Sequence, residues 1–312
     1  MAAIAALKDY QQFGLKNEAV EGTEETLVAA DYTMLSYDCE IRRITEQAER
    51  RPTGTSFAPL QGVEARRLAE GKAIIEIASS GSSSIAPLSF AALLSSGAEL
   101  GAGQLIKWGA ESSSVVRGLA TTFGWNDGVY HRRCYGARST VKLRPNDKGF
   151  LVAELAFQGK YSRTSGGFVT GITQSTRRPA PCPGSMLQLD GVAAQWNEIG
   201  IDIGGKLETL EDYSAANLAG QTVRTEPNES ADIVVFETGS PDWEAKTQNL
   251  TSTDLLPLQW TLGAGANNTL DLIGVLALTN VERIYVNAAA AFRLTGNFIR
   301  NGAAGSLYLA QS

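Results

Sequence analysis

An active site of the nucleophilic or acid–base kind needs a histidine base or a close pair of carboxylates, and this chain offers little of either. His131 is the only histidine, and no Ser, Cys or Asp stands at a spacing that would complete a Ser-His-Asp or Cys-His site around it. Any two of the 33 acidic residues could meet for glycoside hydrolysis, but no spacing selects a pair. We therefore predict that the protein is not an enzyme and has no catalytic residues.

The cysteines have no metal-binding or redox spacing. Cys39, Cys134 and Cys182 are an odd number and form neither a CxxC pair nor a zinc pattern. Such free thiols are typical of proteins that fold in a reducing cytosol. The glycine motifs that bind nucleotides are also incomplete. We predict no metal and no cofactor.

Arginine pairs are the remaining residues that could bind a charged partner. The net charge of −6 opposes a protein that grips nucleic acid, which needs clustered Lys and Arg. Acidic residues are interleaved with the first three pairs, and Arg is favoured at protein interfaces. We predict charge pairs across a subunit interface, from the pairs Arg42-Arg43, Arg50-Arg51, Arg66-Arg67, Arg132-Arg133 and Arg177-Arg178.

The composition suits a β-protein that buries surface against copies of itself. The chain has 312 residues, of which 43% are hydrophobic, only 19% are charged and 32 are Gly. This length could hold two domains of roughly 150 residues each. The apolar start, Met1 to Leu7, lacks a basic region, and no apolar run has the length of a membrane helix. We expect neither secretion nor a membrane partner.

Changes of composition divide the chain into four parts. Residues 1–30 lack a long periodic pattern and are predicted to be an N-terminal arm that orders on a neighbour. Residues 31–165 form a first β-unit. Residues 166–185, rich in Gly, Pro and Arg, form a linker. Residues 186–312 form a second β-unit with the same coarse order of strands, helix and hairpin strands.

Turn and capping residues predict where these elements end. Asn126-Asp127-Gly128 and the segment from Arg144 to Gly149 predict hairpin turns. Pro87 to Leu94 predicts a short helix that Gly97 ends. In the second unit, Ser240 to Glu244 has the N-cap, Pro and acids that open a helix.

Two similar sequence patterns predict that one β-unit occurs twice in the chain. Residues 155–161 and 292–298 share alternating apolar residues, a Gly, a polar residue and an aromatic, so that Gly159 matches Gly296 at an offset of 137. A second set matches at an offset of 158, which makes the second copy 158 − 137 = 21 residues shorter. A duplicated β-unit favours a chain that tiles a ring or wall. The second set matches Glu40, Ile41, Ala73, Ile75 and Ile77 to Glu198, Ile199, Ala231, Ile233 and Val235.

The chain resembles the major tail tube proteins of long-tailed, siphovirus-like bacteriophages with non-contractile tails. Most of its length takes part in the resemblance. The residues that carry it are Ala6-Leu7-Lys8, Glu18-Ala-Val-Glu-Gly22-Thr23 and Ala29-Ala30-Asp31 in the arm, Gly136 to Val141 with Glu154 to Tyr161 in a hairpin, and Phe292 to Gly296 in the closing strand.

The resemblance implies a mainly β fold and a structural role. Each unit would be a β-sandwich or barrel with a short flanking helix, and the units would assemble into a closed ring barrel. Stacked rings would form the tail tube, whose lumen conducts DNA during ejection without binding it specifically. The duplication favours a trimer with pseudo-sixfold symmetry over a hexamer. The implied partners are further copies, the tape measure protein and the tail terminator and tip proteins. The protein would be made in the host bacterial cytoplasm and reside in the virion tail.

The resemblance also suggests where functional residues lie. Acids on long strands could face the lumen and repel DNA phosphates, and Glu40, Glu76 and Asp202 are the candidates. Arg66-Arg67 and Arg132-Arg133 must then not face the lumen unpaired. Deleting residues 1–30 should leave folded monomers and block stacking. The candidate contacts between rings or subunits are Leu7, Tyr10, Arg42, Arg43, Arg50 and Arg51.

Two other functions remain open from the residues alone. A β-rich carbohydrate-binding or carbohydrate-active protein could use Trp125, Trp196, Trp243 or Trp260 as sugar platforms. Another virion β-protein, such as a capsid decoration or sheath component, would fit the same composition.

Overall fold

The computed structural model describes most of the chain. Side chains are not described at 47–50, 60–65 and 88. The described residues are 11–50, 60–80, 87–101, 105–109, 118–215, 219–237, 242–248, 255–263, 269–300 and 306–311.

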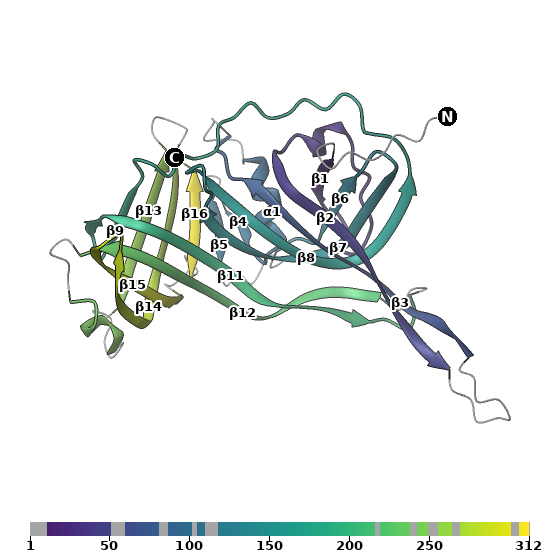
Figure 1. Ribbon diagram of the computed structural model, residues 1–312. Coiled ribbons are helices and arrows are strands. Elements are labelled where there is room, and N and C mark those ends of the chain that lie inside the picture. The colour runs from purple at the N-terminus through teal and green to yellow at the C-terminus, as the bar shows by residue number, and fades with distance from the viewer. Residues whose placement is uncertain are drawn as a thin grey trace.

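The protein is mainly β, as the alternating sequence predicted, with 66% strand and 5% helix. Its strands form one large antiparallel sheet that does not close on itself in the single chain. The sheet runs through both halves of the molecule (Figure 1), and the buried apolar residues of both halves form one contiguous core.

In the first half, the strands pair in the order β1-β6-β7-β8-β3-β2. The predicted turns are confirmed: Gly128 and Gly149 have left-handed φ angles of 84° and 79°, in the turns that follow β6 and β7. Two short strands, β4 and β5, lie apart from this path. The bounds are β1 Gln12–Asn17, β2 Ser36–Arg50, β3 Leu60–Glu76, β4 Glu99–Gly101, β5 Leu105–Trp108, β6 Thr121–Asn126, β7 Tyr130–Pro145 and β8 Leu151–Ser165.

The second half repeats this pairing order as β9-β13-β14-β15-β12-β11. The strand hairpins β2–β3 and β11–β12 correspond, as do β7–β8 and β14–β15. The bounds are β9 Met186–Leu189, β10 Val192–Ala194, β11 Trp196–Glu211, β12 Ala219–Phe236, β13 Leu256–Gly263, β14 Thr269–Val286, β15 Ala289–Phe298 and β16 Leu307–Gln311.

Of the three strand matches predicted from the sequence, the pairing is consistent with two. Gly159 of β8 pairs with Ala69 of β3, and Gly296 of β15 pairs with Ala231 of β12. The pairing thus matches Ala69 to Ala231, an offset of 231 − 69 = 162, so the predicted match of Ala73 to Ala231 is wrong by four residues. The hairpin partners of these strands keep the predicted offset of 158.

The two halves meet at a seam that joins β7 to β11. Ile201, Asp202 and Ile203 of β11 pair antiparallel with Leu143, Lys142 and Val141 of β7. Because of this seam, the strands β2-β3-β8-β7-β11-β12-β15-β14 form one uninterrupted wall.

Long strands bend from this wall into a second layer. β7 and β14 each contain a bulge, between Tyr135 and Arg138 and between Leu278 and Asn280. On the N-terminal side of each bulge, β7 pairs with β6 and β14 pairs with β13. The strand β16 also joins the layers of the two halves, since it pairs with both β14 and β5 (Figure 1).

A short flanking helix was predicted in each half. The predicted first helix is confirmed as α1 Leu88–Leu94, preceded by Pro87 and followed by Gly97 with φ 85°. In the second half, the described residues 242–248 contain a 3₁₀ turn, η2 Ala245–Gln248, where Asp242 accepts a hydrogen bond from the backbone N–H of Ala245. Ser240 lies outside the described residues.

Residues 1–30 were predicted to be an arm that orders on a neighbour, but the described part of this segment, from residue 11 on, contains a strand that pairs within the same chain. Residues 12–17 form β1, which pairs with β6 and buries Phe13 and Leu15. A 3₁₀ turn, η1 Ala29–Tyr32, follows and buries Tyr32. Pairing with a distant strand supplies the partner that the local sequence lacks. Residues 166–185 contain no strand, although Pro179 and Pro181 each make an isolated bridge.

Candidate functional site

The candidate site is the side of the wall that faces away from the core, here called the open face. Along β7, for example, Val141 and Leu143 are buried in the core while Lys142 between them is exposed. The same alternation in the other strands gives the open face a charged surface on which acids outnumber bases. Its charged residues are Asp38, Glu40, Arg42, Glu70, Lys72, Lys142, Arg144, Glu154, Glu198, Asp202, Asp232, Glu282 and Arg293.

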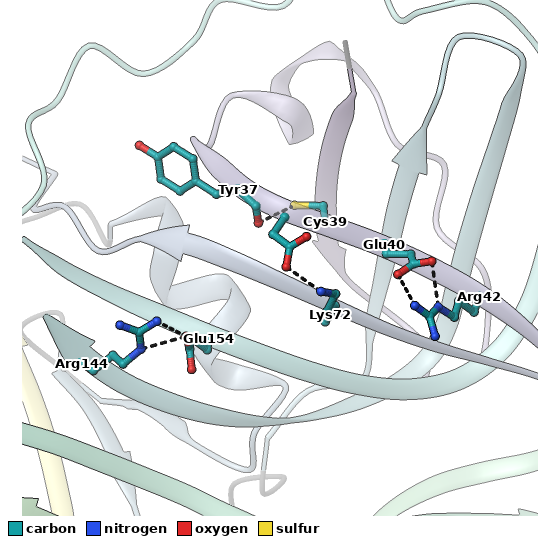
Figure 2. A network of polar contacts seen from close by, with 8 residues as sticks. Tyr37, Cys39, Glu40, Arg42, Lys72, Arg144 and Glu154 are labelled. Atoms are coloured by element: carbon teal, nitrogen blue, oxygen red, sulfur yellow. Dashed lines mark hydrogen bonds and ion pairs between the residues drawn. The ribbon is translucent and has the colours of Figure 1, made fainter. Parts of the chain in front are cut away.

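Ion pairs neutralise two open-face bases of the first half, Arg42 and Lys72. Glu40 accepts two hydrogen bonds from Arg42, both 2.8 Å long, and Asp38 accepts one of 2.6 Å from Lys72. Figure 2 shows Glu40 and Arg42 facing each other along β2. The hydrogen bonds from Arg42 lower the pKa of Glu40, so this predicted acid is ionised but carries its own counter-ion.

The same arrangement continues across the wall. Arg144 donates to Glu154 from two nitrogens, at 2.8 and 2.5 Å (Figure 2). In the second half, Arg293 makes a two-pronged contact with Asp232 at 2.9 to 3.1 Å. Paired bases cannot hold phosphate groups as strongly as bare ones, so the open face is suited to face a polyanion without retaining it.

Glu76, one of the acids predicted to face the lumen, is largely covered within the single chain. Only 7% of the residue is exposed, and its carboxylate accepts a hydrogen bond from the Tyr37 hydroxyl. This hydrogen bond is the largest cause that raises the pKa of Tyr37 to about 12. Glu76 therefore anchors the end of β3 to β2.

Asp202 lies on the open face at the seam, opposite Lys142. The strands diverge beyond this point and leave a polar groove of about 450 Å³. The groove is lined by charges of both signs, so it has no single preference for a cation or an anion. Its charged lining residues are Lys142, Arg144, Asp147, Glu198, Asp202 and Asp232.

Three of the four arginines that should not face the lumen unpaired, Arg66, Arg132 and Arg133, have acidic partners. Arg66 contacts Glu46 and donates to the carbonyl of Thr209. Arg133 forms an ion pair with Glu24. Arg132 contacts Asp127 at 3.2 Å and lies over the Trp125 ring.

The remaining predicted contact residues are only partly placed. Arg42 and Arg43 are exposed on β2, and the backbone of Arg50 ends that strand. Leu7, Tyr10 and Arg51 lie outside the described residues.

His131 and the three cysteines, the residues first considered for chemistry, form no metal-binding cluster in the described part of the chain. The Nε2 atom of His131 lies 2.6 Å from the carbonyl oxygen of Gly167. All three cysteines are buried, and burial raises the pKa of the Cys39 and Cys182 thiols to about 11 and about 12. Among the described residues, no three His, Cys, Asp or Glu side chains are grouped to hold a metal ion.

The tryptophans offer no open aromatic platform in the described part of the chain. Trp243 and Trp260 are buried. Trp196 packs edge-on against Trp260, with ring centroids 5.6 Å apart, and Trp125 is partly buried beneath Arg132.

A buried contact that sequence reasoning missed joins the resemblance motifs. The Glu18 carboxylate accepts hydrogen bonds from the N–H groups of Gly136 at 2.5 Å and Gly22 at 2.7 Å, and from the Thr122 hydroxyl at 2.9 Å. Burial is the largest influence on this carboxyl and raises its pKa. The motif Glu18 to Thr23 thus holds the β7 bulge; an acid among glycines, far from its partner in sequence, gave no local signal of that contact.

Comparison with known proteins identifies no relative, so the function of this protein is argued from its fold and its open face. No model of a known protein family matches the chain. No curated protein matches it in sequence. In the described segments, no helix is long and apolar enough to span a membrane.

Proposed function

We propose that this protein is a virion structural protein, the tail tube subunit of a long-tailed phage with a non-contractile tail. One observation carries the proposal: the seam between β7 and β11 joins two halves of the same strand order, edge to edge, into one wall. In this proposal, a single chain supplies two neighbouring units of a repeating barrel wall. Repetition of this join between copies would close a ring and remove the exposed strand edges.

The charges of the open face support its role as the lumen wall. The bases Arg42, Arg144 and Arg293 each have an acidic partner, and acids outnumber bases on this face. DNA would pass such a wall without lasting contacts. The proposed partners are copies of the chain in a trimeric, pseudo-sixfold ring, with the tape measure, terminator and tip proteins of the tail.

Other functions receive less support. A carbohydrate-binding protein would use exposed aromatic rings, whereas Trp243 and Trp260 are buried. A decoration or sheath protein needs no continuous wall through both halves. We therefore propose that the protein resides in the virion tail, after synthesis in the host bacterial cytoplasm.

Electron microscopy of the purified protein at high concentration, in negative stain, tests the proposal. Hollow striated tubes or stacked rings are expected, with the mass of three chains for each ring in native mass spectrometry. Dispersed monomers at every concentration, also in the presence of the other tail proteins, would contradict it. Binding to intact capsids instead would identify a decoration protein.

A further inference from the structure

The seam within the chain provides a template for the contact between chains. Its three residue pairs are Ile201 with Leu143, Asp202 with Lys142, and Ile203 with Val141. The corresponding strands, β2 for β11 and β14 for β7, end the wall on its two sides. Among the described strands, β2 pairs only with β3, and β14 beyond Ala277 pairs only with β15.

The repeated pairing fixes which residues correspond. Val141 pairs with Leu155, and Arg283 pairs with Phe292. Leu155 and Phe292 differ by 292 − 155 = 137, the offset of Gly159 and Gly296, so Val141 corresponds to Arg283, an offset of 142. For β2 and β11 the offset is 158, as between Glu40 and Glu198.

Transfer of the seam gives a specific register. Asp202 of β11 corresponds to Ile44 of β2, because 202 − 158 = 44. Lys142 of β7 corresponds to Ile284 of β14, because 142 + 142 = 284. The flanking pairs become Thr45 with Arg283, and Arg43 with Tyr285. We infer that the β14 edge of one subunit pairs antiparallel with the β2 edge of the next, with Ile44 opposite Ile284. This inference rests on the proposed ring assembly and specifies its contact.

The side chains favour this register. Within the chain, the central pair joins opposite charges, Asp202 and Lys142, and between chains it would join two isoleucines. Opposite charges and apolar pairs both stabilise antiparallel neighbours. A slip of one residue would set Ile44 against Arg283 or against Tyr285.

The exposed side chains at the β14 edge indicate a second copy as the occupant. Tyr285 is 71% exposed, whereas its counterpart in the seam, Leu143, is fully buried. The two edges lie at opposite ends of one wall, so the contact is head-to-tail and generates a ring when the rotation closes.

Disulfide cross-linking in assembled rings tests the register. The double variant Ile44→Cys/Ile284→Cys has one cysteine on each edge, and the native cysteines are buried. The matched control Ile44→Cys/Glu282→Cys moves one thiol by two residues, where diagonal neighbours are about 7–8 Å apart and too distant for a disulfide. On a non-reducing gel, oxidation should convert the Ile284 variant from monomer into a covalent species that ends at the ring size, and the control should remain monomeric.

The outcomes separate the register from the function. Rings in the microscope without a cross-link between positions 44 and 284, or with equal cross-linking in the control, would overturn the register and leave the tube intact. If the wild-type protein forms neither rings nor tubes, the proposed function is overturned, and this inference falls with it.

Discussion

Gly159 and Gly296 occupy the same structural position in the two halves of the protein. Each faces the bulge of the neighbouring strand, and a Cβ atom placed on either would lie 2.6 Å from the Tyr135 carbonyl oxygen or 2.7 Å from the Ala277 carbonyl oxygen. These distances involve backbone atoms, which cannot move aside as a flexible side chain can. Both glycines are thus required by the bulges that bend β7 and β14.

Replacing either glycine with alanine should destabilise the fold. Overpacking of this kind costs typically about 1–3 kcal/mol, so Gly159→Ala and Gly296→Ala should each lower the free energy of unfolding by that order in denaturant titrations. Gly167→Ala is the control, because no atom lies within 4 Å of the position that a Cβ atom would take there. Equal stability of all three variants would contradict the role of the bulges.

The contact between Tyr37 and Glu76 predicts a stability loss at alkaline pH. The folded protein retains the Tyr37 proton more tightly than the unfolded chain, because the pKa rises from 10.0 to about 12. The contribution is therefore present below the ordinary pKa and is lost as the pH rises toward 12. Free energies of unfolding across this range should fall less steeply for Tyr37→Phe than for the wild type. Parallel slopes for the two proteins would disprove the contact.

The N-terminal strand is expected to stabilise the subunit and not only its assembly. Phe13 packs with Phe123 and Phe157, and its ring centroid lies 6.1 Å and 6.4 Å from theirs. Phe13→Ala should lower the free energy of unfolding by about 3–5 kcal/mol. Val20→Ala, at a residue 66% exposed, is the control. Deletion of residues 1–30 should accordingly unfold monomers, contrary to the expectation from sequence, and a stable truncated monomer would refute the packing.

The ion pairs of the open face predict how the tube treats DNA. Glu154→Gln removes the partner of Arg144 and should make assembled tubes retain DNA at low salt, with retention lost as salt rises. Glu244→Gln makes the same change of charge at an exposed residue of the turn before η2. Filter binding of labelled DNA by assembled tubes measures the effect. If both variants retain DNA equally, the open face is not the surface that DNA meets.

The sequence by itself determined the local geometry. Alternating apolar residues predicted a mainly β chain, since strand side chains alternate between two faces. Glycines with left-handed φ angles marked the turns at Gly128 and Gly149, and Pro87 marked the start of α1. The similar patterns around Gly159 and Gly296 predicted two similar hairpins, and in the structure each glycine packs against the backbone of a bulged strand.

Only the tertiary structure decided which strands pair and in which register. The match of Ala73 to Ala231 was wrong by four residues because an even shift preserves the alternation of faces, and the pattern alone cannot detect it. The burial of Glu76 and the pairing of β1 with β6 depend on partners far away in sequence. The seam at Asp202 and Lys142 is likewise a long-range contact. Periodicity records which face a side chain occupies, whereas the neighbour across the sheet is selected by packing of the whole chain.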